Sequence, residues 1–316
     1  NNLLNHANLG VTYLYLDRLE DAKAAFDLAL TRKLDGLILR LNIYSLAFLR
    51  GDGAEMGRQV AWGTGKPGEE DALLSAQSDT EAYYGRMDRA RDLSRRAMDS
   101  AVRADAKEIA ALWQVNAALR EAELGNSDRA RREARAALAL SSGRNVVVVA
   151  ALTLARSGDV GRAKALAAEL RQNYPNNTLV QLYWLPTIDA AVKLEAGNSS
   201  PALADLEPAS AYELGQADMF INYLYPAYVR GQAYLGAHHG ASAAAEFQKL
   251  LDHRPLVLNF VTGALAHLEI GRAYAMAGNT AKAKAAYQDF FTLWKDADSN
   301  IPVLKQAKAE YATLHR

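Results

Sequence analysis

The chain contains no cysteine among its 316 residues, and this absence removes several kinds of chemistry. Disulfide bonds, thiol nucleophiles and cysteine-ligated zinc or iron–sulfur centres all require the thiol. Proline is also scarce, with 8 residues, so long stretches can stay helical without interruption. The 36 basic residues equal the 36 acidic residues, so no net charge attracts the chain to nucleic acid or to an acidic membrane.

A long apolar run is missing as well. The longest one extends from Val146 to Ala155. It is far shorter than the ~20 residues that a membrane-spanning helix requires, so it predicts a buried helix and no membrane contact within this chain. The chain starts at Asn1, without a methionine or a leader and inside a helical pattern. We therefore expect a fragment of a longer protein.

Catalytic and metal-binding motifs are also missing. The string Gly63–Gly68 resembles a phosphate-binding loop, but Val60 stands at the first glycine position and Pro67 replaces the hydroxyl residue. The 6 histidines are scattered, and none has a carboxylate at metal-ligand spacing on one helix face. We expect no catalytic residue, no cofactor and no metal site, and hence no enzyme activity in this chain. The arginine-rich segments 86–96 and 129–135 are interleaved with acidic residues, which argues against a nucleic-acid partner.

A repeated pattern of small and aromatic residues fills the chain. Small residues at Gly10, Gly231 and Gly271 are each followed at fixed spacing by an aromatic residue, an alanine and a second aromatic residue. The three copies are Tyr13–Ala22–Phe26, Tyr234–Ala243–Phe247 and Tyr274–Ala283–Tyr287. This pattern resembles the tetratricopeptide repeat (TPR), a helix pair of about 34 residues. Weaker copies lie between these, with opening positions at Ala22, Met56, Ala90, Ala130, Ala163, Ala202, Ala243 and Ala283.

The resemblance implies an all-α, right-handed superhelical solenoid of about eight TPR-like helix pairs in a single domain over 1–316. The predicted units are 3–36, 37–70, 71–104, 105–143, 144–177, 178–222, 223–257 and 258–297, followed by a capping helix over 301–314. One pair cannot bury its apolar face alone, so stacking on the next pair supplies the stability.

In this repeat family the first helices of successive pairs line a groove that holds an extended peptide. The family's groove positions fall on Tyr15, Tyr83, Trp184, Tyr225, Tyr228, Gln232, Arg272 and Met276, together with Asp79. These residues imply a groove for apolar or aromatic side chains, with a few aromatic anchors. The alternative is that the tyrosines pack between longer helices. An open apolar groove would favour peptide binding, and a closed pocket with convergent polar groups would favour a small molecule or an enzyme.

Segments 225–254, 263–298, 73–91 and 111–123 are similar to the C-terminal repeat region of large bacterial serine/threonine protein kinases. In those proteins a kinase domain, often followed by a membrane span, precedes the repeats. The resemblance implies a non-catalytic protein–protein interaction scaffold that regulates a kinase or recruits its substrates. Similar repeats follow winged-helix regulators, which leaves a small-molecule-sensing domain as the alternative. The compartment stays open between the bacterial cytoplasm and the non-cytoplasmic side. We also expect self-association through the N-terminal face.

Overall fold

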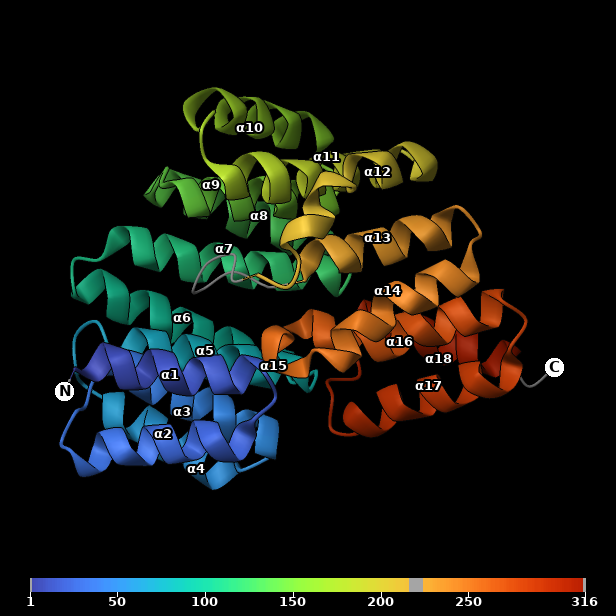
Figure 1. Ribbon diagram of the computed structural model, residues 1–316. Coiled ribbons are helices and arrows are strands. Elements are labelled where there is room, and N and C mark those ends of the chain that lie inside the picture. The colour runs from blue at the N-terminus through green and yellow to red at the C-terminus, as the bar shows by residue number, and fades with distance from the viewer. Residues whose placement is uncertain (1, 216–223, 315–316) are drawn as a thin grey trace.

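The computed structural model describes residues 2–215 and 224–314, and all regular structure in these ranges is helical (Figure 1). Most of the described chain consists of eight helix pairs followed by one final helix. The first four pairs are α1 (Leu3–Tyr15) with α2 (Leu19–Thr31), α3 (Leu37–Arg50) with α4 (Gly53–Gly63), α5 (Glu70–Tyr83) with α6 (Met87–Arg103), and α7 (Lys107–Glu123) with α8 (Ser127–Leu140). The next four are α9 (Arg144–Arg156) with α10 (Val160–Asn173), α11 (Leu185–Glu195) with α12 (Ser199–Asp205), α13 (Tyr225–Gly236) with α14 (Gly240–Asp252), and α16 (Val261–Met276) with α17 (Thr280–Leu293).

Short elements complete the chain. A π-helical turn over Val180–Trp184 leads into α11, and a 3₁₀ turn over Pro208–Tyr212 follows α12. The short helix α15 (Arg254–Val257) joins the seventh and eighth pairs, and α18 (Pro302–Thr313) follows the eighth. The predicted all-α solenoid of stacked helix pairs is confirmed.

Glycine allows the two helices of a pair to approach closely. A Cβ atom placed on Gly231 of α13 would lie 2.6 Å from the ring of Phe247 on α14, which is fully buried. Gly271 of α16 faces Tyr287 of α17 in the same way, with a Cβ-to-ring distance of 3.0 Å. The repeat pattern in the sequence therefore records a contact between the two helices of each pair.

We expect Gly231→Ala to lower the free energy of unfolding by about 1–2 kcal/mol, because the added methyl group overpacks a rigid ring. The matched control is Gly57→Ala in α4, where nothing lies within 4 Å of the added Cβ. There the same change is expected to stabilise by about 0.5–1 kcal/mol, because alanine is the better helix former. Urea denaturation of both variants checks the pair. Equal effects of the two substitutions would contradict the close approach.

The superhelix closes on itself. Helix α16 of the eighth pair contacts α5 and α7 of the third and fourth pairs, and α15 contacts α1. Figure 1 shows the first pairs and the last pairs side by side at the lower edge of the molecule. In an open solenoid each helix pair touches only the neighbouring pairs. The contacts between the first and last pairs therefore distinguish this chain from an open solenoid.

The segment Trp294–Val303, which we call the clasp, fixes this closure through four hydrogen bonds to the third and fourth pairs. The indole Nε1 of Trp294 donates to the carbonyl of Tyr83 at 2.9 Å, and the backbone N–H of Asp298 donates to the carbonyl of Gly85 at 3.0 Å. The Asp298 carboxylate accepts from the backbone N–H of Asp88 at 2.8 Å. It therefore caps the first turn of α6, whose own N-cap residue makes no side-chain bond. The fourth bond joins the Val303 N–H to the Leu124 carbonyl at 3.3 Å.

The closed form is compact. Its accessible surface is 13,414 Å². A single-domain globular protein of 34.4 kDa is expected to expose about 12,900 Å². The surface of this solenoid is therefore close to that of an ordinary globular domain.

Candidate functional site: the inner groove

In the closed superhelix, most of the residues predicted to line the groove are buried in the core. Tyr225 and Tyr228 on α13 are 0% and 1% exposed, and Trp184 is 3% exposed. The Tyr225 hydroxyl donates to the carboxylate of Glu123 on α7, which also receives two hydrogen bonds from Arg156 on α9, at 2.7 and 2.9 Å. These side chains connect three first helices across the inside of the molecule. They leave no surface for a peptide, so the expectation that they are aromatic anchors is corrected.

Tyr83 is also buried, with its ring centroid 5.0 Å from that of Phe48 in a T-shaped contact. Arg272 holds the final helix, since it forms two hydrogen bonds to Glu310 of α18 at 2.9 and 3.1 Å. Gln232 is half-buried beside Glu269, while Met276 is 40% exposed at the end of α16. The structure therefore does not bring these four residues together in one groove.

An open hollow of about 110 Å³ remains on the inner side of the first four pairs, and we call it the inner groove. Four first helices and the loop before α16 line it. The lining residues are Tyr15, Ile38, Leu41, Asn42, Ser45, Ala72, Ser75, Ala76, Asp79, Trp113, Asn116, Leu258, Asn259 and Phe260. Of the predicted groove residues, Tyr15 and Asp79 lie here.

Asn42, Asp79 and Asn116 occupy corresponding places on three successive first helices, at equal spacing along the chain. The recurrence of a polar residue at this place was the signal in the sequence for the inner groove. The groove predicted from the sequence rested on aromatic positions and did not include Asn42 or Asn116. Asn259 carried no such signal, since it lies outside the repeat pattern.

A buried polar cluster adjoins the inner groove at Ala76, which is one of the lining residues. The hydroxyl of Tyr44 and the hydroxyl of Thr80 lie 2.8 Å apart, and both residues are less than 5% exposed. The carbonyl of Ala76 accepts from both hydroxyls, at 3.3 and 3.1 Å. Burial raises the pKa of Tyr44, so its hydroxyl keeps its proton and remains a donor.

Asp79, which lines the inner groove, belongs to a buried ion pair. Asp79 accepts from Arg120, which is 6% exposed and also donates to Ser78 at 2.9 Å and to Ser94 at 2.6 Å. Burial raises the pKa of the Asp79 carboxyl even though Arg120 acts in the opposite direction. The groove therefore combines apolar walls with a few fixed polar groups, which is the composition of a binding site.

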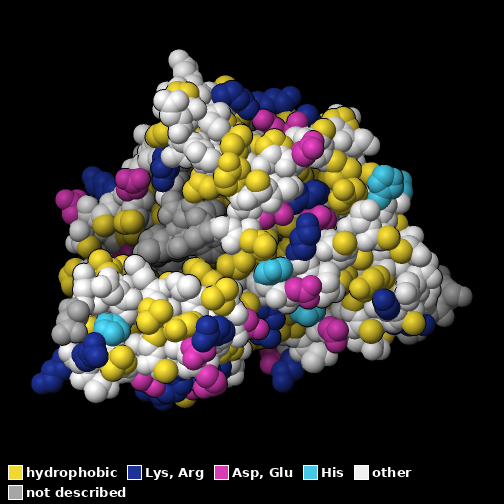
Figure 2. All heavy atoms as spheres, in the orientation of Figure 1, with side chains coloured by type: hydrophobic (Ala, Val, Ile, Leu, Met, Phe, Trp, Pro, Cys, Tyr) yellow, Lys and Arg dark blue, Asp and Glu magenta, His cyan; other side chains and the backbone are white. Residues whose placement is uncertain are grey.

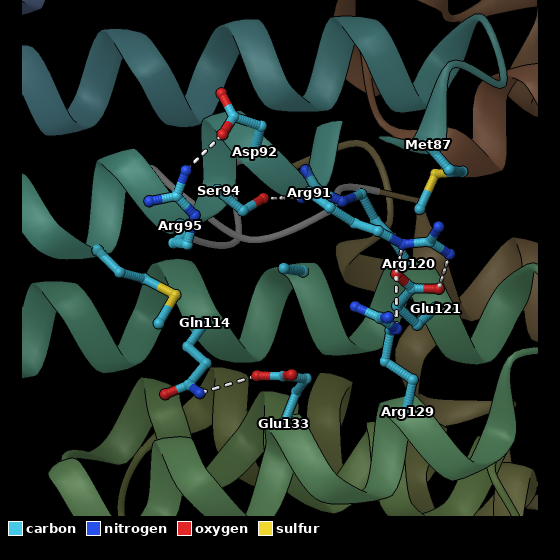
Figure 3. A pocket seen from close by; sticks show the side chains of 12 residues that line it. Met87, Arg91, Asp92, Ser94, Arg95, Gln114, Arg120, Glu121, Arg129 and Glu133 are labelled. Atoms are coloured by element: carbon cyan, nitrogen blue, oxygen red, sulfur yellow. Dashed lines mark hydrogen bonds and ion pairs between the residues drawn. The ribbon is translucent and has the colours of Figure 1, made fainter. Parts of the chain in front are cut away.

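A second hollow, the outer pocket, lies between α6, α7 and α8 and has a volume of about 300 Å³ (Figure 3). Its charged side chains pair with one another. Arg91 forms two hydrogen bonds to Glu121, at 2.7 and 3.0 Å, Arg95 binds Asp92 at 2.5 Å, and Gln114 donates to Glu133 at 2.9 Å. These pairs neutralise most of the arginine-rich segments that the sequence singled out, so the pocket presents no strong field of one sign.

The face in Figure 2 shows basic and acidic side chains mixed with apolar ones, without a continuous basic area. Within residues 2–215 and 224–314, no group of three His, Asp or Glu residues could hold a metal ion. Among the same residues, no helix combines the length and the apolar character needed to cross a membrane.

No family model matches the sequence, and no curated protein matches it significantly. Among solved structures, the chain is similar to the TPR domain of P58(IPK), with 14% identity, a TM-score of 0.31 and coverage of 99% of this chain and 98% of that chain. It is also similar to yeast Tom70, with 11% identity, a TM-score of 0.42 and coverage of 99% and 89%.

At such identities and scores the neighbours carry no argument about function. The glycine-to-ring packing of the helix pairs decides the fold. The fold is TPR-like.

Proposed function

We propose that this chain is a non-catalytic protein-interaction scaffold that binds an extended segment of a partner protein in the inner groove. One observation carries the proposal. The first helices of four successive pairs leave an open, partly apolar groove, while closure fills the inner face of the later pairs. An extended peptide suits such a groove, because its side chains can reach several helices in turn.

The resemblance to bacterial serine/threonine kinases supports a finer version of this proposal. In that version the chain is the regulatory or substrate-recruiting region that follows a kinase domain. Partner recruitment would then bring substrates to the kinase, and no catalytic residue of this chain would take part.

A pull-down from native lysate with the full chain as bait tests the groove. Asn42→Arg with Ser45→Arg fills the groove from α3, because both residues are half-buried and line it. Asn198→Arg, on an exposed turn residue between α11 and α12, is the matched control. We expect the native and control baits to capture the same partner and the groove variant to lose it. Capture by all three baits, or by none, would contradict the proposal.

The outer pocket favours a second candidate function, the sensing of a small molecule. Its volume and its convergent arginine and glutamate side chains suit a polar ligand of modest size. A ligand that binds only the folded state raises the melting temperature. A metabolite that raises the melting temperature of the native chain, but not that of Arg129→Gln, would favour this function.

Self-association through the N-terminal face is also a proposal. Leu4, Leu9 and Leu16 of the first helix and its C-cap are 46%, 47% and 63% exposed. Contact between two copies of the chain would remove these apolar side chains from water. Sedimentation that stays monomeric at all concentrations would contradict it.

A further inference from the structure

A loop of the chain itself occupies one end of the inner groove. Residues Leu258–Phe260, which we call the inner loop, lie between α15 and α16 and line the groove together with α1, α3, α5 and α7. All three residues are partly buried. Residues of the eighth pair's entry segment thus lie where the peptide of a partner would lie.

The three residues of the inner loop contact successive helix pairs. Leu258 packs against the apolar cluster that Leu14, Leu39 and Ile43 form in the first two pairs. The Asn259 amide reaches α5 of the third pair. Phe260 lies beside Leu119 of the fourth pair. The inner loop therefore crosses the first helices in order, as an extended ligand would.

Asn259 makes the specific contact. Its side-chain Nδ2 donates to the carbonyl of Ala76 at 2.7 Å and to the hydroxyl of Thr80 at 3.0 Å. These acceptors belong to the buried polar cluster that includes Tyr44. A side-chain amide supplies two donors from one nitrogen, which suits two acceptors that lie close together.

The backbone of the inner loop is strained. Leu258 has φ 52° and ψ −135°. A residue other than glycine adopts this backbone conformation only at a cost in free energy, because its Cβ atom is crowded there. A free peptide with the same side chains need not adopt it. The strain raises the free energy of the form in which the loop occupies the groove, and it therefore favours a competing peptide.

We propose that the inner loop is an internal ligand of the inner groove, and that the natural partner carries an asparagine between two large apolar residues and binds by displacing this loop. The proposal rests on the proposed scaffold function and names the partner's chemistry. The central asparagine would occupy the site on Ala76 and Thr80. The flanking side chains would take the places of Leu258 and Phe260.

A labelled nonapeptide that reproduces residues 254–262 is the probe, and the same peptide with alanine at the asparagine position is its control. Fluorescence anisotropy measures binding to three forms of the chain over residues 1–316: the native one, Asn259→Ala, and the triple variant L258G/N259G/F260G, in which the groove is emptied. We expect the probe to bind the triple variant at least about tenfold more tightly than the native chain, because the resident loop no longer competes at its high effective concentration. The Asn259→Ala chain is expected to bind with intermediate affinity. The control peptide is expected to bind at least about tenfold more weakly than the probe, because two hydrogen bonds to buried acceptors are lost.

Two further variants define the site. Thr80→Val removes one acceptor with little change in shape and is expected to weaken the probe but not the control peptide. Asn176→Ala, in an exposed loop after α10, makes the same change elsewhere and is expected to behave as the native chain. Should the triple variant fail to fold by circular dichroism, the comparison of Asn259→Ala with Asn176→Ala decides.

Equal binding of the probe to the native and Asn259→Ala chains, equal binding of the probe and the control peptide, or no binding at all would overturn the proposal. The pull-down separates this failure from that of the scaffold function. If capture depends on Asn42 and Ser45 while the probe fails, the groove binds a partner of other chemistry. If both fail, the scaffold function falls as well.

Discussion

Trp294→Ala is expected to lower the free energy of unfolding by about 3–5 kcal/mol, the range typical of a buried tryptophan. Trp294 is 3% exposed, and its indole packs against Phe290 with a centroid distance of 4.7 Å. The substitution also removes the hydrogen bond to the Tyr83 carbonyl, a contact between residues 211 positions apart. Urea denaturation followed by circular dichroism measures the loss.

The matched control is Trp62→Ala. Trp62 is only half-buried on α4, and its ring contacts Lys66, with the Nζ atom 3.5 Å from the ring centroid. We expect this change to lower the free energy of unfolding by about 1 kcal/mol, because it removes cation–π contacts with Lys66 and Arg40 near the surface. If both substitutions lower the free energy of unfolding by the same small amount, the clasp does not stabilise the closed form.

Arg120→Met is expected to lower the free energy of unfolding by about 3–5 kcal/mol at neutral pH, because it leaves the Asp79 carboxylate buried without its partner. The direction of the pH dependence follows from the raised pKa of Asp79. The folded state holds this proton more tightly than the unfolded state, in which the pKa is about 3.9. The stabilisation that the protonated Asp79 carboxyl contributes is therefore complete below that pH. It is lost as the pH rises through the pKa of Asp79 in the folded state. The cost of Arg120→Met should be larger at pH 7 than at pH 4.

The double variant Arg120→Met with Asp79→Leu completes a thermodynamic cycle. Replacing both ions with apolar side chains removes the unpaired charge, so we expect most of the lost stability to return. Denaturation curves of the four chains at both pH values measure the coupling. A double variant as unstable as Arg120→Met alone would contradict the role given to the ion pair.

The helix pairs could be predicted from the sequence because their determining contacts are local. Gly231 and Phe247 belong to one pair, and the residue types at both positions are constrained by the same close approach. The capping helix α18 was equally visible as an amphipathic segment after the last pair. The acids interleaved with the arginine-rich segments were also visible in the sequence, but their pairing, such as that of Arg91 with Glu121, was not predicted.

The closure of the superhelix could not be predicted in this way. It depends on small rotations between successive pairs, which add up along the array and leave no local pattern in the sequence. Tyr225 shows the consequence. Its position on a first helix predicts a place in the groove, but closure brings it against Glu123 of α7 and buries it completely. Asn259 was missed for the same reason, because its partners on α5 are distant in sequence.

The radius of gyration in solution tests the closed superhelix most directly. For a compact chain of 316 residues the expected value is about 20 Å. Small-angle X-ray scattering of the native chain at several concentrations should give this value and a single-peaked pair-distance distribution. A radius roughly a quarter larger than the compact value, with an elongated distribution, would show an open solenoid and contradict the account.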